Sequence, residues 1–170
     1  MSGNSSSSVV PKKILVPIDF SASSHAALDA ATELAEKFHA EIVLLNVIPE
    51  FPNVSLPDSI AVAGVIEKAK QDANERFALS QSSLGAKGIV VRAGVEVSND
   101  VAGTILEAIE REEANLVVIT THGLSGWYPQ VFGSTAEKIV KLAQCPLLLL
   151  RTPKPETTAK VPFERSMEWW

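Results

Sequence analysis

Short runs of mostly apolar residues alternate along the chain with longer segments in which apolar residues recur every three or four positions. An uninterrupted apolar run is typical of a strand buried on both faces, and the longer repeat is typical of a helix with one face against a core. We therefore predict strands over residues 14–18, 42–48, 89–92, 116–120 and 147–151. The longer repeat predicts a first helix that ends near residue 39 and three more helices over residues 58–84, 100–113 and 134–143. A turn is expected at 94–99.

Single residues refine the first of these segments. Pro17 cannot donate to a sheet ladder, so we expect it at the carboxyl end of its strand. Ser21 is a natural N-cap for the first helix, which ends near His39 and carries Phe38 on its apolar face.

Five strands that alternate with four helices predict an α/β fold, a doubly wound parallel sheet with helices on both faces. In such sheets the ligand crevice lies beyond the carboxyl ends of the strands, where the strand order reverses. If the strands 14–18 and 116–120 flank that reversal, Asp19 and the loop 123–134 face each other across one crevice.

The segment from Leu116 to Ser134 has the order strand, glycine-bearing loop and helix, and the helix begins Gly133-Ser134-Thr135. Backbone N–H groups, two hydroxyls and the positive end of the helix dipole then point to one place, which suits an anion such as phosphate. The same residues also start many helices that bind no ligand. Both interpretations stay open on this loop alone.

The composition predicts one compact domain. The chain has 170 residues, of which 46% are hydrophobic, which is enough for a core. We expect the α/β domain to cover residues 12–151. A disordered, serine-rich tail at 1–11 precedes it, and a C-terminal tail at 152–170 follows.

Charge and apolar runs argue against several classes of partner. The formal net charge is −5 and no block of Lys and Arg occurs, which argues against nucleic-acid binding. No apolar run approaches the roughly 20 residues of a membrane helix, and the N-terminal tail lacks the apolar core of a signal peptide. We therefore expect a cytoplasmic protein that contacts neither nucleic acid nor membrane.

The remaining candidate residues indicate packing more than chemistry. No ligand spacing relates the three histidines, His25, His39 and His122, so we expect no metal site and no catalytic triad among them. Cys145 is the only cysteine, and we expect it to be a buried packing residue. Trp169 and Trp170 are costly to expose, so the C-terminal tail is expected to fold back on the domain or to cover a partner subunit.

Five short motifs, in this order and over this fold, resemble those of the universal stress protein family. They are Val16-Pro17-Ile18-Asp19-Phe20-Ser21, Leu44-Leu45-Asn46-Val47, Thr121-His122-Gly123, Gly133-Ser134 and Cys145-Pro146. The resemblance covers roughly residues 12–151. It implies the strand order 3-2-1-4-5 and a homodimer formed through the strand Leu147 to Arg151.

Members of the ATP-binding branch of this family carry a glycine, two residues, a second glycine, nine residues and then Gly-Ser. Here Gly123 is followed by nine residues and then by Gly133-Ser134, which matches. The position of the first glycine holds Thr120, which departs from the pattern. A side chain there either crowds the phosphates or donates a hydroxyl to them.

The resemblance implies ATP, alone or with Mg²⁺, in the crevice. By analogy Asp19 lies near the ribose, and the backbone of Val47 meets the edge of the adenine. The phosphates are then held by Gly123, Gly133, Ser134 and Thr135. The expected site is completed by Pro17, Thr120 and His122.

The function implied is that of a stress-response regulator that binds an adenine nucleotide and hydrolyses ATP slowly at most. A nucleotide-independent dimeric scaffold of the same fold is the first alternative, favoured by Thr120 and by a loop, residues 124–132, without Lys or Arg. An adenine-nucleotide hydrolase is the second. It is disfavoured because such enzymes usually carry a Ser-Gly-Gly phosphate loop after the first strand, where this chain has Asp19-Phe20-Ser21-Ala22.

Overall fold

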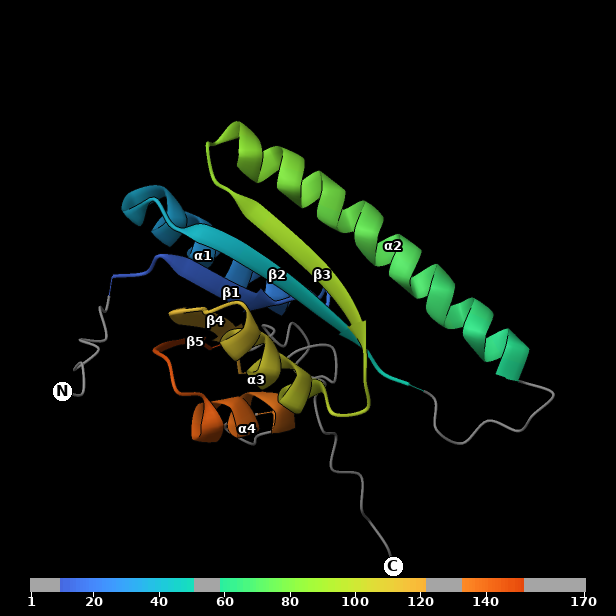
Figure 1. Cartoon of the computed structure of the whole chain (residues 1–170). Helices are drawn as coiled ribbons and strands as arrows, with labels where there is room; N and C mark the ends of the chain where they lie inside the picture. The colour runs from blue at the N-terminus through green and yellow to red at the C-terminus, as the bar shows by residue number, and fades with distance from the viewer. Residues whose placement is uncertain (1–9, 51–58, 122–132, 152–170) are drawn as a thin grey trace, which may run out of the picture.

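The computed structural model describes residues 10–50, 59–121 and 133–151. Within them, the chain forms one parallel sheet with the strand order β3-β2-β1-β4-β5, as expected for the doubly wound α/β class (Figure 1). The strands are β1 (Lys13–Pro17), β2 (Glu41–Ile48), β3 (Val91–Val97), β4 (Leu116–Thr120) and β5 (Leu147–Leu150). The helices are α1 (Ala22–Phe38), α2 (Ser59–Ala86), α3 (Val101–Arg111) and α4 (Ser134–Leu142).

Each face of the sheet has its own apolar core, because successive strand residues point to opposite faces. Ile14 and Val16 of β1 pack with Ala27 of α1 and Phe77 of α2. Leu15, between them in sequence, packs on the other face with residues of α3 and α4. The central strands are therefore apolar along most of their length, and the helices lie in pairs on the two faces (Figure 1).

The strand β3 differs from its prediction. A strand over 89–92 and a turn over 94–99 were expected, but β3 runs from Val91 to Val97 and pairs along that length with β2. The prediction is wrong because β3 is an edge strand whose residues are mostly half-buried. A strand at such a place alternates apolar and polar residues, and its uninterrupted apolar run is short.

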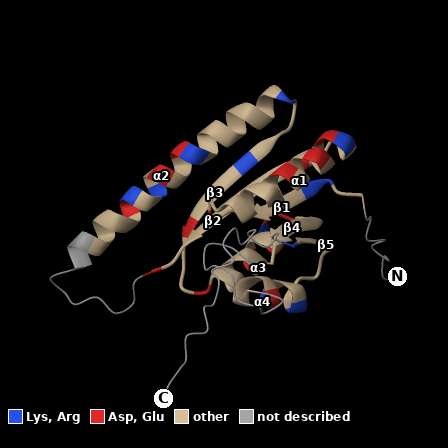
Figure 2. Cartoon of the chain, turned by 180° about the vertical axis from the view of Figure 1, so that it is seen from behind, with Lys and Arg blue, Asp and Glu red and all other residues tan. Residues whose placement is uncertain are grey.

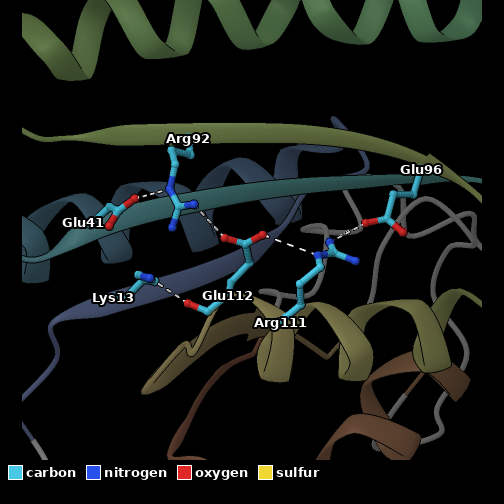
Figure 3. A network of polar contacts seen from close by, with 6 residues as sticks. All are labelled: Lys13, Glu41, Arg92, Glu96, Arg111 and Glu112. Carbon is cyan, nitrogen blue, oxygen red and sulfur yellow. Dashed lines mark hydrogen bonds and ion pairs between the residues drawn. The ribbon is translucent and has the colours of Figure 1, made fainter.

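Polar residues of β3 join an ionic network on the face that α3 borders (Figure 3). Arg92 pairs with Glu41 of β2 and with Glu112 at the end of α3. Arg111 bridges the same Glu112 to Glu96 of β3, with 2.6 Å between its Nη2 and the Glu96 Oε1. These pairs are partly exposed, and each contributes about 0–1 kcal/mol.

The two ends of α1 and the end of α4 differ in how far they agree with the expectations for single residues. Ser21 is the N-cap of α1, and its side chain accepts a hydrogen bond from the Ser24 N–H, as predicted. Phe38 was expected on the buried face but is 37% exposed, because it is the last residue of α1, where the chain turns through His39 at φ 54°. Val140, near the end of α4, is likewise exposed.

Cys145 was expected to be buried, but it is only half-buried. It packs against the apolar core on the α3–α4 face, and burial raises the pKa of its thiol. A raised pKa keeps the thiol protonated and unreactive at neutral pH. Its role among the described residues is packing.

No helix in the described part of the chain is long and apolar enough to cross a membrane. Four expectations lie outside the described residues: the serine-rich tail up to residue 9, the C-terminal tail with Trp169 and Trp170, and the site residues His122 and Gly123.

Candidate functional site: a crevice at the switch point

The chain leaves β1 along a fixed path toward the crevice. Pro17 is the last residue of β1, as expected from its missing N–H. The N–H of Ile18 donates to the carbonyl of Leu45 at 2.8 Å, and the buried side chain of Asn46 donates to the carbonyl of Ile18 at 2.7 Å. The backbone N–H and carbonyl of Ile18 are thus both bonded to residues of β2, and these bonds fix the position of the next residue, Asp19.

The turn after Ile18 is strained and tightly bonded. One carboxylate oxygen of Asp19 accepts from the Ser21 N–H at 3.0 Å and from the Ser21 hydroxyl at 2.6 Å. Between them, Phe20 has φ 61°, which costs a residue with a side chain about 1–2 kcal/mol. The Phe20 ring packs on Phe77, with the ring centroids 5.3 Å apart. The turn therefore carries Asp19 at the crevice and Phe20 in the core between α1 and α2.

The opposite wall is formed by the end of β4 and the start of α4. The N–H of Thr121 donates to the carbonyl of Leu150, and the N–H of Gly133 donates to the carbonyl of Thr121 at 2.9 Å. A Cβ on Gly133 would lie 3.0 Å from that carbonyl oxygen, so the glycine allows the close approach. Its φ of −63° shows that positive φ is not the reason.

The start of α4 has no side-chain cap. Gly133 is the N-cap, and Ser134 and Thr135 are helical residues. Simple capping by a serine or threonine hydroxyl therefore does not explain this Gly-Ser-Thr sequence. The N–H groups of the first turn and the helix dipole favour an anion here.

These two walls enclose a crevice with about 130 Å³ of space that water can reach. Five of the predicted site residues line it together: Pro17, Asp19, Val47, Thr120 and Thr135. Gly133 and Ser134 adjoin it at the start of α4 but do not line it. His122 and Gly123 lie outside the described residues, so their place in the site stays a prediction.

The crevice also has lining residues that the sequence analysis missed, and most of them are apolar. They are Ile18, Ser24, Leu45, Val101, Ile105 and Ile119. Leu45 had a usable signal, because it lies two residues before Val47 and therefore on the same face of β2. Val101 and Ile105 had none, since only the packing of α3 over the sheet brings them to the crevice.

A surface ion pair joins the start of α3 to the middle of α4. Asp100, the N-cap of α3, accepts from the Gly103 N–H at 2.9 Å and from Lys138 of α4 at 2.8 and 2.9 Å. The Lys138 ammonium and the Gly103 N–H lower the pKa of Asp100. A Cβ on Gly103 would lie 2.4 Å from the Asp100 carboxylate, so a side chain there would displace this carboxylate from its present position.

The fold and the crevice together define a class: a doubly wound α/β domain with a small-molecule site where the strand order reverses. The family model described as the universal stress protein family matches residues 11–151. The chain belongs to this family.

Relatives and solved structures agree with this assignment. A universal stress protein of Methanocaldococcus jannaschii is 34% identical over 146 residues, which is 85% of each chain. The universal stress protein UspA from Lactobacillus plantarum has the same fold, with a TM-score of 0.76 and 20% identity over 82% of this chain and 97% of that one.

Two further solved structures of this fold are described with a nucleotide. One is a universal stress protein in complex with cAMP, with a TM-score of 0.58 and 20% identity over 85% of this chain and 99% of that one. The other is a universal stress protein family protein from Arabidopsis thaliana with AMP bound. It has a TM-score of 0.60 and 18% identity over 88% of this chain and 97% of that one.

Proposed function

We propose that this protein is a stress-response regulator that binds an adenine nucleotide, ATP first among them, in the crevice between the ends of β1 and β4. The observation that carries the proposal is that Pro17, Asp19, Val47, Thr120 and Thr135, which come from four separate segments, line one crevice. The structures described with cAMP and with AMP support the choice of an adenine nucleotide.

The crevice offers a different chemistry at each end. The apolar side chains of Leu45, Val47 and Val101 suit the faces of a purine ring. The Asp19 carboxylate has about four acceptor sites, so it accepts ribose hydroxyls in addition to its bonds from Ser21. The phosphates would then lie at the uncapped start of α4, near the hydroxyl of Thr135.

Mg²⁺ would be bound mainly by the phosphates and water in this arrangement. Within the described residues, no group of three or more His, Cys, Asp and Glu side chains is placed to hold a metal ion. Magnesium commonly keeps several waters and binds through substrate phosphates, so the donor set fits a nucleotide-borne ion. We propose slow hydrolysis at most, because the carboxylate lining the crevice, Asp19, is assigned to the ribose.

We also propose a cytoplasmic homodimer formed through β5. This strand is the edge of the sheet, and its four residues, Leu147–Leu150, are all leucines that remain half-buried in the single chain. An exposed apolar edge strand is a template for pairing, and natural proteins cover it. A second copy of β5 would do so.

Calorimetric titration with ATP and Mg²⁺ tests the nucleotide proposal, using protein that has been unfolded and refolded to remove co-purified ligand. We expect micromolar binding, about −8 kcal/mol. Gly133→Val should abolish it, because the new side chain meets the Thr121 carbonyl oxygen and displaces the start of α4. Gly85→Val is the matched control, since a Cβ there meets nothing within 4 Å.

The second candidate function is a nucleotide-independent scaffold. It is favoured by Thr120, a buried side chain in the crevice wall where ATP-binding relatives are expected to have glycine. No heat and no thermal shift with ATP in the refolded protein would support the scaffold. Thr120→Gly would then show whether this side chain is what prevents binding.

A further inference from the structure

A second pocket opens between α1 and α2, on the face of the sheet opposite α3 and α4. It holds about 210 Å³ of space that water can reach. Its floor is apolar and consists of Ile18, Leu28, Leu44 and Phe77. Ile18 is also part of the crevice wall, so the two hollows are neighbours separated by the end of β1.

Phe20 separates this pocket from the nucleotide crevice. It follows Asp19 directly, and its positive φ turns the ring to the core between α1 and α2. The ring lines the second pocket and is absent from the lining of the crevice. A ligand between α1 and α2 would therefore contact Phe20 without entering the nucleotide site.

A cationic side chain lies at the mouth of the pocket. The guanidinium of Arg76 stacks on the Phe20 ring, with its Cζ 4.9 Å from the ring centroid. Arg76 is the last charged residue of α2, and the helix beyond it carries no charge (Figure 2). Stacking on an aromatic ring leaves the planar N–H donors of an arginine in position for an anion.

Arg76 differs from two other arginines of the described chain. Arg92 and Arg111 each form ion pairs with two carboxylates. Among the described residues, no carboxylate lies within ion-pair distance of Arg76. The neighbouring Glu75 accepts instead from the side chain of Gln71. The charge at the pocket mouth is thus uncompensated within the part of the chain that the structure describes.

His25 provides a second polar group at the pocket. Its Nδ1 lies 2.7 Å from the carbonyl oxygen of Ser21 and donates to it, because a carbonyl can only accept. The pocket therefore combines an apolar floor, the Arg76 guanidinium and the imidazole ring of His25.

We propose that this pocket binds a small amphipathic carboxylate, a short- to medium-chain fatty acid or a molecule of that shape. The apolar chain would lie against Leu28, Leu44 and Phe77, and the carboxylate would meet Arg76. A carboxylate matches the fork of one guanidinium and carries one charge, so a single arginine suffices for it. The space is below that of a typical pocket for drug-sized ligands, which favours a short chain.

Octanoate is the probe that tests this proposal, titrated into the full ¹⁵N-labelled chain and followed by backbone amide shifts. We expect saturable shifts at Leu28 and Ser80, with a submillimolar dissociation constant. The amides of Val47 and Thr135, at the crevice, should stay in place. Octylammonium, which has the same chain and the opposite charge, should bind at least about tenfold more weakly, a difference of about 1.4 kcal/mol.

Two pairs of variants on α2 locate the site. Arg76→Gln should weaken octanoate binding at least about tenfold, whereas Lys68→Gln, which removes a positive charge elsewhere on the helix, should leave it unchanged. Ser80→Trp should abolish binding because Ser80 lines the pocket. Asn74→Trp, at an exposed position that does not line it, should not.

The proposal is overturned if octanoate causes no saturable shifts or if the shifts fall on the crevice. It is also overturned if both Arg76→Gln and Ser80→Trp bind octanoate as the parent chain does. Far-ultraviolet circular dichroism of each variant shows whether it keeps the fold. Because Ser80→Trp is compared with Asn74→Trp, a general effect of the large ring is separated from filling of the pocket.

Discussion

The two walls of the crevice are built in different ways. The wall at the end of β1 is held by buried and local side-chain bonds: Asn46 holds the carbonyl of Ile18, and Ser21 holds the carboxylate of Asp19. The wall at the end of β4 is held by the backbone contact between Gly133 and Thr121 and by the exposed ion pair of Asp100 with Lys138.

We infer from this difference that the β1 wall of the crevice is the more rigid of the two and that the α4 wall is the more easily displaced. Buried hydrogen bonds in a low dielectric are costly to leave unmade, so the β1 wall is fixed before a ligand arrives. An exposed ion pair is weak and screened by salt, so the α4 wall is more easily displaced. On the proposed function, the side of the crevice for the adenosine is preformed, and the side for the phosphates adapts to one, two or three of them.

Removing a hydrogen bond from the β1 wall should lower the free energy of unfolding more than any other change proposed here. Asn46→Ala removes the donor that satisfies the Ile18 carbonyl, which should lower the free energy of unfolding by about 1–3 kcal/mol. Urea denaturation measures this change. Asn74→Ala, at an exposed position of α2, is the control and should cost far less. Equal losses in the two variants would contradict a preformed β1 wall.

The strain at Phe20 can be separated from the packing of its ring by two variants. Phe20→Ala and Phe20→Gly both remove the contact with Phe77, but only glycine adopts φ 61° without strain. Phe20→Gly should therefore be more stable than Phe20→Ala by about 1–2 kcal/mol. Thermal or urea unfolding of the pair measures the difference, and a less stable glycine variant would refute the strained turn.

Breaking the other wall should cost less. Asp100→Ala removes both the N-cap of α3 and the partner of Lys138, so it loses two stabilising contacts. Lys138→Gln removes only the exposed ion pair and should cost less. Chemical denaturation measures the loss of unfolding free energy in both variants. A larger loss for Lys138→Gln than for Asp100→Ala would contradict this prediction.

The same carboxylate predicts a small dependence of stability on pH. The pKa of Asp100 in the folded chain lies below its ordinary value of 3.8. Its contribution is therefore fully present above pH 3.8 and is lost as the pH falls through the lower folded pKa. In that acidic window, the unfolding free energy of Asp100→Asn should fall less steeply with decreasing pH than that of the parent. Parallel curves would show that the ion pair does not form in solution.

The central strands and the place where the crevice opens follow from local patterns, whereas the strand order 3-2-1-4-5 was implied by the family resemblance. Uninterrupted apolar runs predict β1, β2 and β4, and the polar residue after β1, Asp19, predicts where the ligand site opens. The bounds of the edge strand β3 were predicted wrongly because a half-buried strand carries polar residues such as Arg92 and Glu96. Its extent depends on pairing with β2, which no local pattern encodes.

The missed parts of the site depend on contacts between distant segments. Val101 and Ser24 line the crevice only because α3 and α1 lie over particular strands. The positive φ of Phe20 was not foreseen either, because phenylalanine is not a residue that favours this conformation. The turn is imposed by the bonds on each side of it, from Asn46 and Ser21, and by the packing of the ring.

The central claim is that an adenine nucleotide binds between the ends of β1 and β4. Titration of the refolded ¹⁵N-labelled chain with ATP and Mg²⁺, followed by backbone amide shifts, tests it most directly. The account predicts saturable shifts at Val47, Thr120 and Thr135, with little change at Arg92 and Arg111 in the ionic network. No saturable shifts, or shifts confined to residues outside the crevice, would contradict it.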